Sequence, residues 1–262
     1  LEEFLKKQKN LESFGFEIHR HSFKEKYLKQ NDHLKSFLQC LQQKPILRSL
    51  QLSSGYWSLQ TLSEGLKSLQ MKNHLHTLII ETSNHSKSAL NSAKGLCQFI
   101  KNQKNSLKNL QLSLKDVLAN TPVNLILSAI SQLTQLRTLN ISIDLPEKGS
   151  LDLAHVLPHL ENLQDFSFQF SIKGSNGDNE WIVEMLGALT KLENLRKIEV
   201  KSPSHEAFMG IQTDIVSVVQ AFRSIREITF HLWNGRYADF QYLYNGIEYV
   251  NQRQSLKSEY MF

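Results

Sequence analysis

The pattern Leu-x-x-Leu-x-Leu, in which Phe, Ile or Val can replace Leu, returns eight times along this chain of 262 residues. The occurrences begin at Leu11, Leu47, Leu75, Leu107, Leu136, Leu163, Leu195 and Ile225. Their mean spacing is about 31 residues, which is in the range of repeat architectures. One such repeat cannot bury its apolar face alone, so neighbouring repeats must stack and share a continuous core.

Each repeat predicts a short strand followed by a helix. In the second repeat Leu50 and Leu52 are two positions apart, which places both side chains on one face of a strand. After a turn, leucines return at the intervals of three and four residues that are typical of one stripe of a helix. These leucines are Leu59, Leu62, Leu66 and Leu69. Strands joined by crossover helices run parallel, so the repeats predict a parallel sheet with helices on one face.

This pattern resembles the leucine-rich-repeat family, most closely its long-repeat, ribonuclease-inhibitor-like class. The resemblance covers about residues 11–232. It implies an α/β solenoid of about eight repeats with the shape of a horseshoe, in which a parallel sheet lines the concave face and helices cover the convex face. We therefore expect residues 1–262 to form a single leucine-rich-repeat domain. Residues 1–10 would be the end of a preceding helix, and residues 233–262 an aromatic-rich C-terminal cap.

The repeats depart from the family at the position that usually holds Asn or Cys. Here it holds His19, Gly55, Ser83, Lys115, Asp144, Ser171, Pro203 and Trp233, so no buried Asn ladder is expected. Several repeats instead continue the apolar alternation by one step. Examples are Leu110-Leu112-Leu114 and Phe166-Phe168-Phe170. These repeats predict longer strands whose backbone hydrogen bonds take the place of the ladder.

Sequence motifs for catalysis and metal binding are absent. The chain has no glycine-rich phosphate loop and no Gly-x-Ser-x-Gly elbow. His155 and His159 are four residues apart, but Pro158 between them disrupts a helix, so surface or capping roles are expected. We therefore predict no catalytic residues, metal, cofactor or small-molecule substrate, and a protein that is not an enzyme.

The two cysteines, Cys40 and Cys97, lie on apolar helix stripes. Isolated thiols in such positions are expected to be buried, and they indicate a reducing compartment. We expect a cytoplasmic or cytoskeleton-associated protein. No apolar run approaches the roughly 18 residues of a membrane span, so no membrane span is expected.

Three surfaces are candidates for partner binding, and the first is the concave sheet face. Its residues alternate with the buried ones and are mostly small and polar. They are Ser49, Gln51, Thr77, Asn109, Gln111, Thr138, Asn140, Asp165, Ser167, Lys197, Glu199, Glu227 and Thr229. The face lacks the aromatic anchors of binding hot spots, so a partner would meet it with a hydrogen-bonding ridge. The alternative is a hydrated surface without a partner.

The second candidate is a basic rim, one position before those residues. Its cations are Arg48, Lys108, Arg137, Arg196 and Arg226, with His76 and Gln164 in the same register. Residues 1–115 also carry a net charge of +10, against −5 for residues 116–262. The rim could meet an acidic protein surface or a phosphate backbone, or it is a solvated edge.

The third candidate is the C-terminal cap, with Trp233, Tyr237, Tyr242 and Tyr244. Aromatic residues there could cover the last strand, contact a partner, or do both.

These features favour a non-catalytic protein-protein interaction scaffold or adaptor within a larger intracellular assembly. An alternative is the substrate-recognition subunit of a ubiquitin-ligase-type complex. A nucleic-acid-associated basic solenoid is a second alternative, because the N-terminal residues carry excess positive charge.

Overall fold

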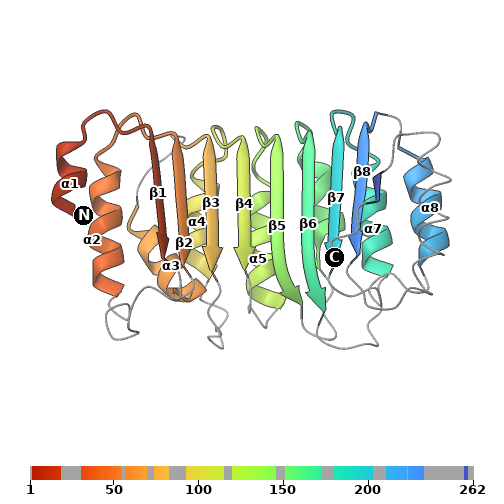
Figure 1. Ribbon diagram of the computed structural model, residues 1–262, viewed down its shortest axis with the longest axis horizontal. Helices are drawn as coiled ribbons and strands as arrows, with labels where there is room; N and C mark the ends of the chain where they lie inside the picture. The colour runs from red at the N-terminus through yellow and green to blue at the C-terminus, as the bar shows by residue number, and fades with distance from the viewer. Residues whose placement is uncertain are drawn as a thin grey trace. The chain divides into compact units, whose positions relative to one another are not determined.

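The computed structural model describes residues 2–18, 31–54, 57–69, 74–82, 93–114, 120–145, 151–172, 180–202, 211–222, 224–232 and 257–258. The chain divides into two compact units, Leu1–Leu136 (unit 1) and Arg137–Phe262 (unit 2). In each unit strands and helices alternate, and the helices lie on one face of the strands (Figure 1). The expectation of a single domain stays a prediction.

Unit 1 contains four parallel strands in its described part. Its elements are α1 (Glu2–Lys7), β1 (Ser13–Ile18), α2 (Asn31–Gln42), β2 (Ser49–Ser54), α3 (Leu59–Lys67), β3 (Thr77–Thr82), α4 (Lys94–Lys101), β4 (Asn109–Leu114) and α5 (Asn120–Ile130). Neighbouring strands pair so that equivalent repeat positions stand side by side: Leu50 lies beside Leu78, and Leu78 beside Leu110. The predicted parallel sheet is confirmed in this unit.

Unit 2 follows the same plan. Its elements are β5 (Thr138–Leu145), α6 (Leu153–Val156), η3 (Leu157–His159), β6 (Asp165–Ile172), α7 (Glu180–Leu189), β7 (Lys197–Ser202), α8 (Gln212–Gln220), β8 (Glu227–Leu232) and β9 (Lys257–Ser258). All neighbouring strands from β5 to β9 pair in parallel. The predicted disruption of the helix at Pro158 is confirmed, since α6 gives way to the 3-10 turn η3 there.

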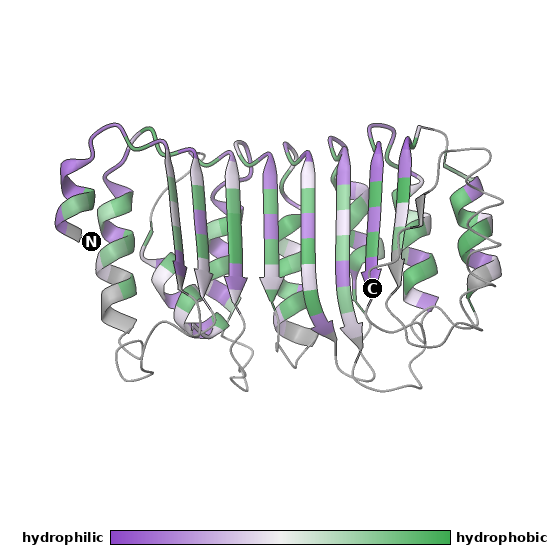
Figure 2. Ribbon diagram, in the orientation of Figure 1, coloured by the Kyte–Doolittle hydropathy of each residue, from purple (hydrophilic) through white to green (hydrophobic). Residues whose placement is uncertain are grey.

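The core of each unit lies between the sheet and its helices. Alternate apolar residues of the strands are fully buried, including Leu50, Leu78 and Ile80. Figure 2 shows this alternation as hydrophobic and hydrophilic bands along the strands. In unit 2 the ring of Phe168 stacks on Phe170 at 5.3 Å and meets Trp181 of α7 edge-on at 5.9 Å. Burial of such side chains is the main source of stability in a stack of repeats.

Helices α3 and α4 of unit 1 pack unusually closely. The Ser63 hydroxyl of α3 accepts hydrogen bonds from the backbone N–H groups of Gly95 (2.8 Å) and Leu96 (3.1 Å). It thereby satisfies donors in the first turn of α4, which have no partner inside the helix. A Cβ atom on Gly95 would overlap the Ser63 carbonyl group. Glycine at this position is therefore a condition for the contact between the two helices.

A buried glutamine supplies hydrogen bonds of the kind that an Asn ladder would provide. Gln103 is fully buried, and its side-chain oxygen accepts from the backbone N–H groups of His74 (3.0 Å) and Leu75 (3.1 Å) in the turn before β3. The expected lengthening of strands occurs in β5 and β6, which span eight residues each. By contrast, β4 spans six described residues, as do β2 and β3.

Both thiols are buried, as predicted. Burial raises the pKa of the Cys97 thiol from 9.0 to about 11, and the opposing effect of Lys101 is smaller. We expect neither thiol to react quickly with Ellman's reagent at about pH 8 in the folded protein, because the reactive thiolate is scarce there and inaccessible. Both should react after unfolding. Because unfolding lowers the pKa of Cys97, this group should also reduce the stability of unit 1 as pH rises from 9.0 towards 11.

A Cys40→Ser variant isolates Cys97 for this titration. Fast labelling of Cys97 in the folded variant would contradict its burial. A stability of unit 1 that falls no more steeply across that pH range in the protein with Cys97 than in a Cys97→Ala control would contradict the raised pKa.

Candidate functional site

The open face is defined here as the side of each sheet opposite its helices. In unit 1 the structure brings the five predicted contact residues together in two rows across β2, β3 and β4. The register aligns Ser49 with Thr77 and Asn109, and Gln51 with Ile79 and Gln111. Asn109 is exposed and the other predicted residues are half-buried. The Asn109 amide also donates a hydrogen bond to the Thr77 hydroxyl at 3.2 Å.

A carboxylate in the next row holds three strands of this face together. Glu81 of β3 accepts from the Ser53 hydroxyl of β2 at 2.8 Å and from the Gln111 amide of β4 at 3.1 Å. Neither Glu81 nor Ser53 was among the predicted contact residues. Ser53 and Gln111 lie on the open face of the two strands that flank Glu81. These positions in the repeat were the sequence signal that could have identified them as partners of Glu81. These bonds fix the side chains of the row in a preorganised arrangement.

The open face of unit 2 carries the other predicted residues. Thr138 and Asn140 lie on β5, Asp165 and Ser167 on β6, Lys197 and Glu199 on β7, and Glu227 and Thr229 on β8. Thr229 is only 4% exposed, so its side chain offers no free contact surface.

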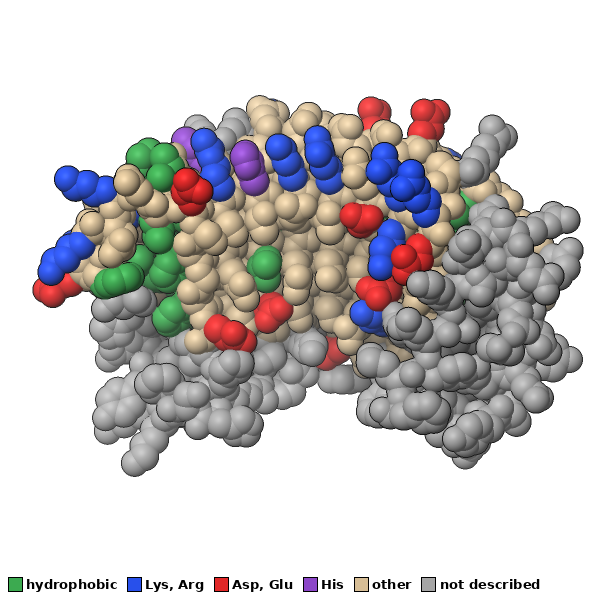
Figure 3. Space-filling model, turned by 45° about the horizontal axis from the view of Figure 1, so that its top comes forward, with side chains coloured by type: hydrophobic (Ala, Val, Ile, Leu, Met, Phe, Trp, Pro, Cys, Tyr) green, Lys and Arg blue, Asp and Glu red, His purple; other side chains and the backbone are tan. Residues whose placement is uncertain are grey.

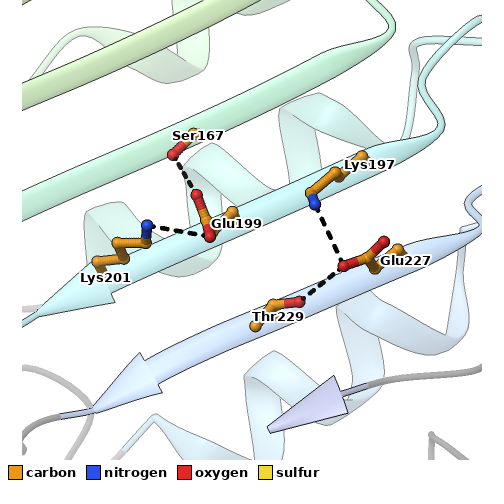
Figure 4. A network of polar contacts seen from close by, with 6 residues as sticks. All are labelled: Ser167, Lys197, Glu199, Lys201, Glu227 and Thr229. Carbon is orange, nitrogen blue, oxygen red and sulfur yellow. Dashed lines mark hydrogen bonds and ion pairs between the residues drawn. The ribbon is translucent and has the colours of Figure 1, made fainter. Parts of the chain in front are cut away.

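Charged side chains on β7 and β8 pair with one another, as Figure 4 shows. Lys197 Nζ lies 3.2 Å from Glu227, and Lys201 Nζ lies 3.0 Å from Glu199. Glu199 also accepts from the Ser167 hydroxyl at 2.7 Å. Such partly exposed pairs add little stability, but they cancel the charge of this surface. The sequence placed Lys197 and Glu227 on this face, and the structure shows that they neutralise each other.

The basic rim of unit 1 consists of Arg48, His76 and Lys108, each directly before a strand. The Arg48 carbonyl accepts from the N–H group of His76 at 2.7 Å, and the His76 carbonyl from that of Lys108 at 2.9 Å. The three residues therefore stand side by side on adjacent strands. Figure 3 shows cationic and histidine side chains in a row along this edge. The pKa of His76 is lowered below its usual value by partial burial and, to a smaller extent, by the positive charges of Lys108 and Arg48.

The basic rim of unit 2 consists of Arg137, Arg196 and Arg226. The same hydrogen bonds join their backbones, at 2.8 Å each, but Gln164 lies between Arg137 and Arg196. The predicted alignment is thus present within each unit. Among the described residues, the row of unit 1 contains only basic side chains from Arg48 to Lys108, whereas the neutral Gln164 interrupts the row of unit 2.

The predicted cap residues Trp233, Tyr237, Tyr242 and Tyr244 lie outside the described residues. Their role stays a prediction.

His155 and His159, which were weighed as metal ligands, belong to no group of three or more possible ligands among the described residues. His155 lies 3.7 Å from Asp152, and both side chains are mostly exposed. Within the described ranges, no three His, Cys, Asp or Glu residues are arranged to hold a metal ion. In the same ranges, no helix has the length and apolar character needed to cross a membrane.

Comparison with known proteins adds little to this geometry. No protein-family model matches the chain, and no curated protein matches it. A solved structure that it resembles is the crystal structure of a TLR13–ssRNA13 complex, with 14% sequence identity and a TM-score of 0.38. The match covers 91% of this chain and 32% of that chain, so this chain spans about a third of its length.

The architecture is established by the chain's own geometry. In-register parallel strands bury the Leu-x-x-Leu-x-Leu side chains in a ladder, and helices back every sheet. Each unit has a leucine-rich-repeat-like fold. The α/β fold class predicted from the repeat is therefore confirmed.

Proposed function

We propose that this chain is a non-catalytic protein-interaction scaffold of the ribonuclease-inhibitor-like class, which works within a larger assembly in a reducing compartment, cytoplasmic or cytoskeleton-associated. The observation that supports this most directly is the open face of unit 1. Its rows of hydrogen-bonding side chains, such as Ser49, Thr77 and Asn109, stand in register on adjacent strands. Adjacent strands are about 4.8 Å apart, so the face offers donors and acceptors at regular intervals.

The side chains of this face suggest the kind of partner it would bind. Ile79 is the one apolar residue in the described rows of β2 to β4, and Gln51 and Gln111 flank it. Hot spots of tight interfaces favour Trp, Tyr and Arg in dry pockets, and these rows contain none of the three. A polar ridge of a partner protein that spreads over several strands suits such a surface better than a single deep anchor.

The polar contacts also favour binding over catalysis. A catalytic site needs an acid or base, a nucleophile and charge-stabilising groups that converge on one reacting atom. On this face Glu81 is instead held by Ser53 and Gln111, and Asn109 by Thr77, so these groups are spread along the sheet. We therefore propose that the face contributes area and hydrogen bonds without chemical turnover.

The proposal is tested by blocking the centre of this face. Thr77 is half-buried between Ser49 and Asn109, so an arginine there would project across the row. A partner identified by photo-crosslinking from Asn109 should bind the Thr77→Arg protein at least about tenfold more weakly, which corresponds to about 1.4 kcal/mol. The dissociation constant is measured by calorimetry with the purified partner.

The matched control is Glu64→Arg on the exposed side of α3, which should leave the dissociation constant unchanged. If Thr77→Arg binds as tightly as the original protein, or if Glu64→Arg weakens binding equally, the open face of unit 1 is not the binding surface.

A further inference from the structure

The basic rim of unit 1 carries positive charge that no described carboxylate neutralises. None of Arg48, His76 and Lys108 forms an ion pair with a described residue, and the Arg48 guanidinium donates instead to the His74 carbonyl at 3.1 Å. The lysines of β7 in unit 2 differ, because Lys197 and Lys201 each contact a glutamate. Unpaired cations in a row create a positive potential that favours an anionic partner.

The backbone holds this row in a fixed geometry. The carbonyl oxygen of Arg48 accepts from both His76 and Thr77, and that of His76 from both Lys108 and Asn109. The three side chains therefore start from one level on strands about 4.8 Å apart and span roughly 10 Å. Arginine can bind a carboxylate with two parallel hydrogen bonds, which makes Arg48 the strongest single contact of the row.

The groups around His76 are almost all cationic or neutral. Arg48 faces it from the β2 side and Lys108 from the β4 side, and His74 precedes it in the same turn. The nearest carboxylate in the row is Glu12, which lies one strand beyond Arg48. Because partial burial and the neighbouring cations Lys108 and Arg48 lower its pKa, the charged form of His76 is disfavoured in the free protein.

We propose that the basic rim of unit 1 docks a short acidic segment of the protein partner, and that His76 strengthens this docking as pH falls. This inference rests on the proposed scaffold function and names the chemistry of one contact within it. An anionic segment beside His76 would favour its charged form, so docking would take up a proton. Affinity for the segment therefore rises as pH decreases through the range in which bound His76 titrates.

The surroundings favour an acidic peptide over a nucleic acid. The next row, Ser49, Thr77 and Asn109, supplies hydroxyl and amide groups that suit carboxylates and peptide backbone. The described residues of these two rows contain no Phe, Tyr or Trp, the large aromatic side chains on which successive bases stack. Glu12 also places a negative charge at one end of the row, which opposes a long polyanion but leaves room for a short acidic cluster.

The test uses the full chain and a fluorescent oligoglutamate peptide, with anisotropy measured at low salt. The Arg48→Gln/Lys108→Gln double variant should bind the peptide about tenfold more weakly, because two contact charges are lost. The matched control is Lys67→Gln/Lys104→Gln, which removes the same charge from exposed positions outside the rim and should bind as the original protein does.

His76→Gln tests the pH dependence. The original protein should bind the peptide several-fold more tightly at about pH 6 than at about pH 8, whereas His76→Gln should show little change. Equal weakening by the control pair, or an unchanged pH dependence in His76→Gln, would overturn the proposal. Tighter binding of a single-stranded oligothymidylate with the same dependence on Arg48 and Lys108 would assign the rim to nucleic acid instead.

Failure of the proposed rim site can be distinguished from failure of the proposed scaffold function. A partner that is sensitive to Thr77→Arg but indifferent to both rim variants would refute the rim site alone. A partner that is indifferent to Thr77→Arg would refute the open face, whatever the peptide does at the rim.

Discussion

A Gly95→Ala variant is expected to lose about 3 kcal/mol or more of the stability of unit 1, because the added methyl group has no space. Its Cβ would overlap the backbone carbonyl group of Ser63 on the neighbouring helix α3. Backbone atoms cannot rotate away as a flexible side chain can, so α3 and α4 must separate. That separation would also break the two hydrogen bonds from α4 to the Ser63 hydroxyl.

Two other helical glycines provide a graded comparison for Gly95. A Cβ on Gly65 would lie 3.0 Å from the ends of the Leu34 and Leu38 side chains, which can adjust, so Gly65→Ala should cost about 1 kcal/mol. A Cβ on Gly187 would meet nothing within 4 Å, and Gly187→Ala should stabilise α7 by about 0.5 kcal/mol or more.

Urea unfolding gives the free energies of the three glycine variants, and hydrogen exchange of peptides from α3, α4 and α7 assigns each effect to its helix. Similar values for Gly95→Ala and Gly65→Ala would show that α3 and α4 are less tightly joined than the structure indicates.

The second large effect is expected from Phe168→Ala, at about 3–5 kcal/mol for unit 2. Phe168 is fully buried at the centre of an aromatic cluster. Its ring lies 6.3 Å from that of Phe166, 5.3 Å from that of Phe170 and 5.9 Å from that of Trp181. Truncation removes the buried area and the ring contacts together, and the stacked strands on either side prevent the cavity from closing.

The unfolding of unit 2 in urea can be followed by the fluorescence of Trp181, which the Phe168 ring contacts directly. Phe4→Ala is the control, because the same side chain at that position is 59% exposed and its loss should change stability little. A cost below about 1 kcal/mol for Phe168→Ala would mean that the neighbouring rings repack, and the cluster would then not determine the stability of this unit.

The leucine period was sufficient to predict the strands and the side of each strand that is buried. Leu50 and Leu52 are both fully buried within β2, and the predicted break at Pro158 separates α6 from η3. Burial follows the backbone period, and the period can be counted from one sequence. The alignment of Arg48 with Lys108 followed for the same reason, because equal positions in successive repeats stand side by side.

The polar partnerships were harder to predict, because hydrophobic periodicity does not specify which rotamers side chains adopt. Glu81 bonds to Ser53 and Gln111, which are 28 and 30 residues away. Lys197 and Glu227 were each predicted to contact a partner protein, but in the structure they pair with each other. Their opposite charges at equal positions of adjacent repeats were the sequence signal for this pairing.

The burial of Gln103 could not be predicted from the sequence. It lies in a polar run of Lys and Asn residues at 101–105, and no pattern distinguishes it from its more exposed neighbours.

The hydrogen bonds of Gln103 have a consequence for the order in which the protein is made. The N–H groups of His74 and Leu75 find their acceptor 29 and 28 residues further along the chain. A ribosome that adds about 5–20 residues per second delivers that acceptor roughly one to six seconds after the turn itself. During this interval the turn before β3 lacks its side-chain acceptor, so this turn is completed only when Gln103 of the next repeat has emerged.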